Sequence, residues 1–198
     1  MTDVLPALPA APTPARPRVL LVGTGLATAA VVMGFAGLIG IYLTVRSNTL
    51  AAGGRWFGED VAIPLTPANM ALFTFLLSAV TMHWAVYAVG NNDRQHAYLA
   101  LGLTMLFGFC VINATTFLYS ESAVSIDDGA SGLLFFTITG AHLVMIVVAL
   151  IYAALMTFRT LGGQYAGRDR EGIIAASVFW YATIAVFALI WYAIYITK

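Results

Sequence analysis

The chain divides into five long apolar runs separated by short polar segments. Each run reaches or exceeds the roughly 20 residues that a helix needs to cross a bilayer, and a strand rarely exceeds about 10 residues. Inside lipid, a helix satisfies its backbone N–H and C=O groups within its own segment. The pattern therefore predicts an all-α integral membrane protein, a bundle of five transmembrane helices. The predicted spans are 19–44, 68–90, 97–119, 131–158 and 172–197.

Arginine and lysine between the spans predict the orientation. With the N-terminus inside, the inner segments carry six basic residues, Arg16, Arg18, Arg94, Arg159, Arg168 and Arg170. The outer segments then carry three, Arg46, Arg55 and Lys198. Basic residues concentrate on the cytoplasmic side of membrane proteins. We therefore expect the N-terminus inside and the C-terminus outside.

Residues 1–18 differ from the rest because they hold five of the seven prolines. Proline at this spacing cannot sustain a helix, so we expect a flexible tail on the cytoplasmic side. Its basic residues, Arg16 and Arg18, come last in the tail, whereas a signal peptide would place basic residues first and an unbroken apolar run after them. The expected domains are this tail, 1–18, and a transmembrane domain, 19–198.

Composition excludes several classes of protein. Hydrophobic residues make up 61% of the chain and charged residues 9%, against about a quarter charged in soluble domains. Nine basic and nine acidic residues leave no excess charge for binding nucleic acid. Cys110 is the single cysteine, so a disulfide framework or a cysteine-based metal site within the chain is excluded.

The predicted spans contain little reactive chemistry. No Asp, Glu, Lys or Arg falls well inside one, and the two halves do not repeat, which argues against an ion pump or transporter. His83 and His142 could ligate a haem only at similar depth, yet in the predicted spans they differ by about 13 Å at 1.5 Å per residue. His96 falls in the following loop. We interpret both intramembrane histidines as hydrogen-bonded packing residues, and expect no metal or cofactor in this chain.

Other residues in the spans suit helix packing. Gly34, Gly37 and Gly40 would let another helix approach the first span closely, and Asn69 must find a polar partner. Trp180 lies deep in the last span, where we expect it to pack. Aromatic residues near the outer end of that span are typical interfacial anchors; they are Trp191, Tyr192 and Tyr195.

Four ordered motifs resemble subunit III of the haem–copper oxidases. The first span has Phe35-Ala36-Gly37-Leu38 followed by Tyr42 and Arg46, and the second has Pro67-Ala68-Asn69 and Leu76-Leu77-Ser78. The fourth has Phe135-Phe136, then Thr139-Gly140 and His142, and the fifth has Phe179-Trp180-Tyr181 and Trp191. The resemblance covers residues 29–197 and is closest to the shorter, five-helix bacterial forms.

The chain departs from the family pattern where that pattern has ionisable groups. Val31 stands in place of a glutamate, and Asn113-Ala114-Thr115-Thr116 replaces a Q-x-x-E segment. Met145 replaces a second histidine, and Tyr181 and Ile184 replace a histidine and an aspartate. Of the intramembrane ionisable groups in the pattern, His142 alone remains.

The resemblance implies an accessory, cofactor-free subunit of a respiratory terminal oxidase in the bacterial plasma membrane. Its partners would be catalytic subunit I, which holds haems and copper, subunit II, and phospholipids. It would support aerobic electron transport and proton uptake without itself being catalytic. The candidate lipid or subunit-interface residues are Phe35, Gly37, Arg46, Asn69, His142, Arg159 and Trp180. A nitric-oxide-reductase-associated relative and a free-standing small channel or transporter remain alternatives.

Overall fold

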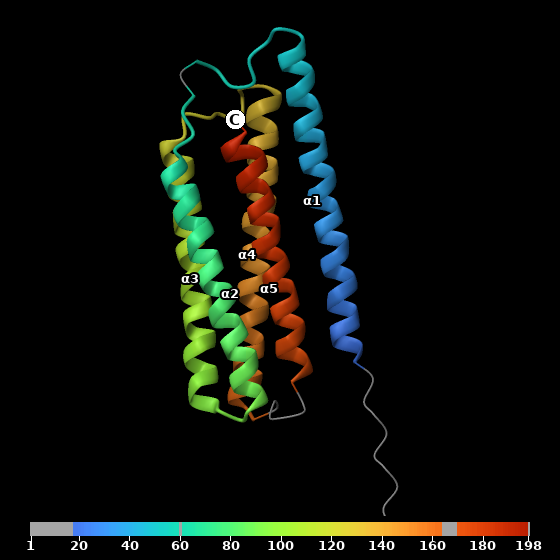
Figure 1. Ribbon diagram of the computed structural model, residues 1–198, viewed down its shortest axis with the longest axis vertical. Helices are drawn as coiled ribbons and strands as arrows, with labels where there is room; N and C mark the ends of the chain where they lie inside the picture. Colours follow the sequence, from blue (N-terminus) through green and yellow to red (C-terminus); the bar gives the residue numbers. More distant parts are fainter. Residues whose placement is uncertain (1–17, 60, 164–169, 198) are drawn as a thin grey trace, which may run out of the picture.

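The computed structural model describes residues 18–59, 61–163 and 170–197, and within them all regular secondary structure is helical (Figure 1). Five of its helices are long and apolar enough to cross a membrane. They are α1 (Val19–Ala51), α2 (Leu65–Gly90), α3 (Arg94–Glu121), α4 (Ala130–Leu161) and α5 (Glu171–Ile190), which continues into a π-helical segment, η1 (Trp191–Ile196). The all-helical, five-span prediction is confirmed. The predicted tail lies outside the described residues, except for Arg18.

Successive helices run in opposite directions, so the connecting loops alternate between the two ends of the bundle (Figure 1). The N-terminal end holds the start of α1 and the turn between α2 and α3. The C-terminal end holds the α1–α2 loop, the α3–α4 loop and the end of η1. Helix α5 packs against α1, α2 and α4, and α2 forms an extensive hairpin with α3.

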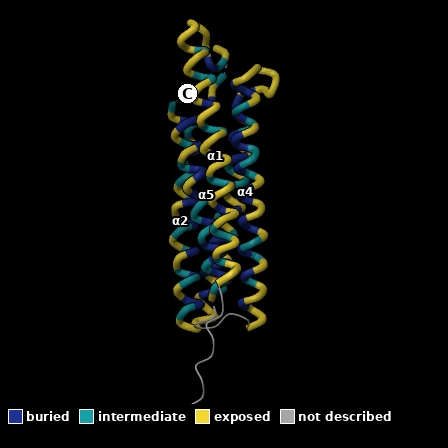
Figure 2. The backbone as a smooth tube through the Cα atoms, turned by 90° about the vertical axis from the view of Figure 1, so that its right-hand side faces the viewer, coloured by how far each residue is buried: buried dark blue, intermediate teal, exposed yellow. Residues whose placement is uncertain are grey.

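Helix α1 joins the bundle along a narrow seam. Its buried residues are Thr28, Phe35 and Tyr42, seven residues apart, while most other positions are exposed (Figure 2). A seven-residue repeat keeps one line of side chains facing a neighbouring helix, as in a coiled coil. The outward face of α1 has no partner within the described residues.

Several helices are longer than the predicted spans, because polar residues at their ends also adopt helical backbone conformation. Helix α1 runs to Ala51 instead of ending at 44, and Gly53, with a φ of 76°, follows in the left-handed region. At the other end of the bundle, the Asp93 side chain caps α3 by accepting a hydrogen bond from the His96 backbone N–H at 3.2 Å. His96 therefore lies in the first turn of α3, and its assignment to the preceding loop was wrong.

The π-helical segment η1 changes which side chains of the last turns are buried. Tyr192 is 62% exposed, as expected of an interfacial anchor, but Tyr195 is only 1% exposed. Hydrogen bonds from residue i to i+5 widen the turn and rotate the residues that follow. The prediction that Tyr195 is an interfacial anchor was wrong for this reason.

Polar contacts join the helices that pack together. Association inside a bilayer relies on packing and hydrogen bonds because lipid is as apolar as the side chains. The contacts are Leu21–Glu171 (α1–α5), Thr24–Tyr152 (α1–α4), Thr81–Thr104 (α2–α3), Tyr119–Thr139 (α3–α4), Ser78–Trp180 (α2–α5) and His142–Thr183 (α4–α5).

Candidate functional site

His142 lies at the centre of the bundle, where four helices meet. Its side chain on α4 is 3% exposed, and Nε2 donates a hydrogen bond to the Thr183 carbonyl oxygen of α5 at 3.0 Å. Phe35 of α1, Phe75 of α2 and Phe187 of α5 surround the imidazole, with ring centroids 6.1, 6.0 and 5.4 Å away. We call these three rings and His142 the aromatic cluster. It places two of the sequence-predicted residues, Phe35 and His142, in direct contact.

Trp180 extends the aromatic cluster toward α3. Its indole Nε1 donates to the Ser78 hydroxyl at 3.0 Å, and its ring lies 6.5 Å from that of Phe75. On the far side it packs against Gly108, where an added Cβ would lie 2.8 Å from the Trp180 ring and 2.7 Å from Leu150. Trp180 thus contacts both α2 and α3, in agreement with its interpretation as a packing residue.

Asn69 fixes the end of the last helix. Its side-chain oxygen accepts a hydrogen bond from Trp191 Nε1 at 2.8 Å, between α2 and η1. Trp191 is half-buried and satisfied by this contact. It therefore packs between two helices, and its role as an interfacial anchor stays a prediction.

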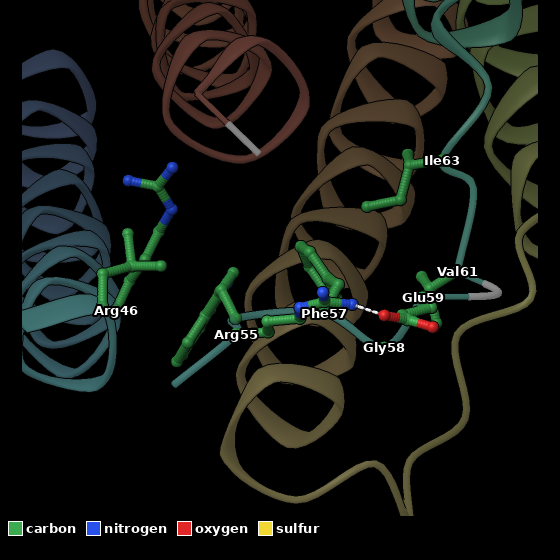
Figure 3. Close-up of a pocket in the computed structure, with 9 residues that line it drawn as sticks. Arg46, Arg55, Phe57, Gly58, Glu59, Val61 and Ile63 are labelled. Carbon is green, nitrogen blue, oxygen red and sulfur yellow. Dashed lines mark hydrogen bonds and ion pairs between the residues drawn. The ribbon is translucent and has the colours of Figure 1, made fainter. Parts of the chain in front are cut away.

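Arg46 lies at the C-terminal end of the bundle and binds the end of the chain's last turn. Its guanidinium donates to the Thr197 carbonyl oxygen, and among the described residues its buried Nε has no hydrogen-bond partner. It lines a cavity of about 340 Å³ together with Arg55, Trp56 and Glu59 (Figure 3). Arg55 forms an ion pair with Glu59 there.

The α1–α2 loop lines much of this cavity, and one aromatic contact holds it against α1. Trp56 Nε1 donates to the Tyr42 hydroxyl at 2.9 Å, with the two rings 5.2 Å apart and nearly perpendicular. Both side chains are buried. The contact holds the loop against α1, so the cavity has a defined shape.

Two predicted residues lie apart from these clusters. A Cβ added to Gly37 would have nothing within 4 Å, so this glycine makes no close helix contact in the described chain. Arg159 is exposed in the last turn of α4, at the opposite end of the bundle from Arg46. A cation there is favoured by the helix dipole.

His83 does not approach His142. It is exposed on the outer surface of α2, so its interpretation as a hydrogen-bonded packing residue was wrong, whereas the same interpretation of His142 is confirmed. The imidazole of His142 is enclosed by phenyl rings and engaged by a carbonyl, an arrangement that does not suit two axial ligands of one haem. The described residues contain no group of three His, Cys, Asp or Glu side chains able to hold a metal ion.

Similarity to known proteins extends over all five helices and nearly the whole sequence. The family profile for cytochrome c oxidase subunit III matches residues 13–198. The chain belongs to the cytochrome c oxidase subunit III family. With its five apolar helices, it is a multi-pass membrane protein.

Individual members of the subunit III family are distant in sequence. Cytochrome c oxidase subunit 3 of Bos taurus is 28% identical over 189 residues, 92% of this chain and 71% of the bovine protein. The subunits of Tetraodon nigroviridis and Struthio camelus are each 27% identical, over 78% and 72% of this chain. The chain spans 60% of the Tetraodon protein and 56% of the Struthio protein.

Sequence reasoning missed several members of the site. Phe75 and Phe187 are ordinary apolar residues by type, and only the helix arrangement shows that they enclose His142. Trp56, in a loop of mixed composition, carried no signal for its contact with Tyr42. Gly108 could have been noticed as a small residue in the third span, but the sequence does not reveal which side chain fills the space beside it.

Proposed function

We propose that this chain is a non-catalytic subunit of a bacterial terminal oxidase of the cytochrome c oxidase type. The observation that carries the proposal is the subunit III match, which extends over residues 13–198 and so includes every described helix. Haems and copper would lie in the partner catalytic subunits I and II. The chain would act in the respiratory chain of the plasma membrane.

Its contribution is a rigid packing surface that stabilises the catalytic subunit and maintains proton uptake during turnover. The aromatic cluster and the interhelical hydrogen bonds support this role, because uncharged side chains at the centre of the bundle join α2, α3, α4 and α5. Val31 and Thr116 are not ionisable, so proton uptake is supported through packing and bound lipid and not by acids at these positions.

Oxygen consumption tests this role. The oxidase purified with the chain and the oxidase stripped of it should start at similar rates, but the stripped enzyme should lose activity within fewer turnovers. Adding the chain back should restore the longer lifetime. Equal lifetimes for the two preparations would refute the supporting role.

Arg46 and Arg159 would bind phospholipid phosphates at the two ends of the bundle. A guanidinium can pair with a phosphate through two parallel hydrogen bonds, and the cavity beside Arg46 also contains Arg55. Native mass spectrometry of the Arg46→Gln variant should show fewer bound anionic lipids than the wild type. The exposed Arg94→Gln variant is the comparison, and an unchanged lipid count for Arg46→Gln would contradict the assignment.

The N-terminus would lie inside and the C-terminus outside. The acidic α3–α4 loop, with Asp127 and Asp128, supports this orientation, since basic residues concentrate on the other side. A reporter active only outside the cytoplasm should be active when fused at Asp127 and inactive at Asn92. Activity at Asn92 and none at Asp127 would show the opposite orientation.

A further inference from the structure

A groove opens on the side of the bundle between α2 and α3, in the half nearest the C-terminal end. It measures about 830 Å³ and is lined by Met70 and Thr74 of α2 and by Phe109, Asn113 and Phe117 of α3, among others. Met70 is 62% exposed, and the two phenylalanines are 56% and 54% exposed. The groove thus faces outward at membrane depth, and none of the described residues fills it.

Asn113 places an amide in this apolar surface. It lies eight residues before Glu121, which is about 12 Å along the helix. Helix α3 has 28 residues, about 42 Å, against a hydrocarbon layer of about 30 Å, so a centred helix carries Asn113 about 6 Å inside that layer. Its side chain is exposed and forms no hydrogen bond within residues 18–59, 61–163 and 170–197.

Two nearby hydroxyl groups at the depth of Asn113 are satisfied without an external partner, whereas Thr66, which also lines the groove, lies in the first turn of α2 at the end of the bundle. Thr74 donates to the Met70 carbonyl oxygen at 2.7 Å, and Thr116 donates to the Ile112 carbonyl oxygen at 3.0 Å. Asn113 differs because its amide exposes two donors and an acceptor to lipid. A polar group in hydrocarbon is costly unless another group hydrogen-bonds to it. The occupant of the groove must therefore offer a hydrogen-bonding group.

A phospholipid does not meet this requirement well. Acyl chains have no hydrogen-bonding group, and the mouth of the groove carries the Glu121 carboxylate with no arginine or lysine among the lining residues. An anionic lipid headgroup would meet a like charge there, in contrast to the cavity beside Arg46 and Arg55. A protein helix can supply both a polar side chain within the membrane and a cation at its boundary.

We propose that the α2–α3 groove is the docking site for one transmembrane helix of a partner oxidase subunit. That helix presents an amide or hydroxyl side chain to Asn113 and a basic residue to Glu121. The two groups are about 12 Å apart, or eight residues along a helix. This inference rests on the proposed function, which supplies the partner, and adds the surface and the chemistry of the contact.

Labelling of the Cys110 thiol reports whether the groove is covered. Cys110 is the chain's single cysteine, it is exposed, and it lines the groove. In the detergent-purified complex, N-ethylmaleimide should label Cys110 at least tenfold more slowly than in the separated chain. A Val144→Cys variant in a Cys110→Ser background is the control, because Val144 is 62% exposed on α4, away from the groove. Its labelling should be similar in both preparations.

Three results would overturn the docking site. One is equal labelling of Cys110 in the complex and the separated chain. Another is protection that disappears on delipidation while the subunits stay together, which would assign the groove to lipid. The third is a crosslink from Cys110 to a second copy of this chain. Failure of the proposed function gives a different result, since no partner subunit would then be purified at all.

Asn113 itself is tested by substitution. Asn113→Leu should reduce the partner retained in detergent at least fivefold, while Thr116→Val, on the same helix but satisfied by its own backbone, should leave retention unchanged. Because Asn113 is exposed, the separated variant should melt at the wild-type temperature, which distinguishes a docking defect from misfolding. Unchanged retention for Asn113→Leu would overturn the assigned contact.

Discussion

The Glu171 carboxylate accepts a hydrogen bond from the Leu21 backbone N–H at 2.9 Å, across 150 residues of sequence. Glu171 begins α5, and Leu21 lies in the first turn of α1, where backbone N–H groups have no partner within their own helix. One carboxylate therefore lies near the positive ends of two helix dipoles. This contact matters for α1 because the rest of that helix is attached along a narrow seam.

Replacing Glu171 should loosen the start of α1. We expect Glu171→Ala to lower the free energy of local opening there by about 0.5–2 kcal/mol, the range for losing a helix cap. Hydrogen–deuterium exchange of residues 19–26 measures the change. Asp127→Ala, in the exposed α3–α4 loop, should leave exchange at α1 unaltered. Unchanged exchange in Glu171→Ala would show that the contact does not hold α1.

Gly108 should tolerate no side chain. The Cβ of Gly108→Ala would lie 2.7 Å from Leu150 and 2.8 Å from the Trp180 ring, and overpacking of this kind costs about 1–3 kcal/mol. Thermal unfolding of the detergent-solubilised chain should show the loss. Gly37→Ala is the matched control, because its Cβ meets nothing within 4 Å and stability should not fall. Equal effects of the two substitutions would contradict the packing around Trp180.

His142 should act mainly as a buried ring. His142→Phe keeps the ring but loses the hydrogen bond to Thr183, so we expect a loss of about 0.5–1.5 kcal/mol in unfolding free energy. His142→Ala should cost about 3 kcal/mol or more, as expected when a buried ring is removed. Denaturant titration, monitored by tryptophan fluorescence, measures the unfolding free energies of the two variants. A larger loss for His142→Phe than for His142→Ala would require a role beyond packing.

Much of the fold could be predicted from run length, because a bilayer leaves helices as the natural form for five long apolar segments. Side-chain partners were harder to predict. Asn69 required a partner, but the sequence did not identify Trp191. Tyr195 was placed at the interface because a regular helix was assumed, and the π-helical turn buries it. His83 and His142 have the same residue type, yet helix orientation exposes one and encloses the other.

The Asp93 cap should persist to low pH. Hydrogen bonds from His96, first from its backbone N–H and also from its ring, hold the pKa of the Asp93 carboxyl below its usual value. Because the folded-state pKa lies below the unfolded one, the stabilisation is present above the unfolded value and is lost as pH falls through the folded value. Exchange at the first turn of α3 should rise only at that lower pH. In Asp93→Ala it should be high at neutral pH, and a wild-type turn that opens above the usual aspartate pKa would contradict the assignment.

Purification of the tagged chain from its native membrane in mild detergent tests most directly whether it is an oxidase subunit. The eluate is measured by a reduced-minus-oxidised spectrum and by peptide identification of its subunits. Membership of an oxidase predicts haem bands and a catalytic subunit in equal amount with this chain. A colourless eluate that contains this chain alone would contradict its membership of an oxidase.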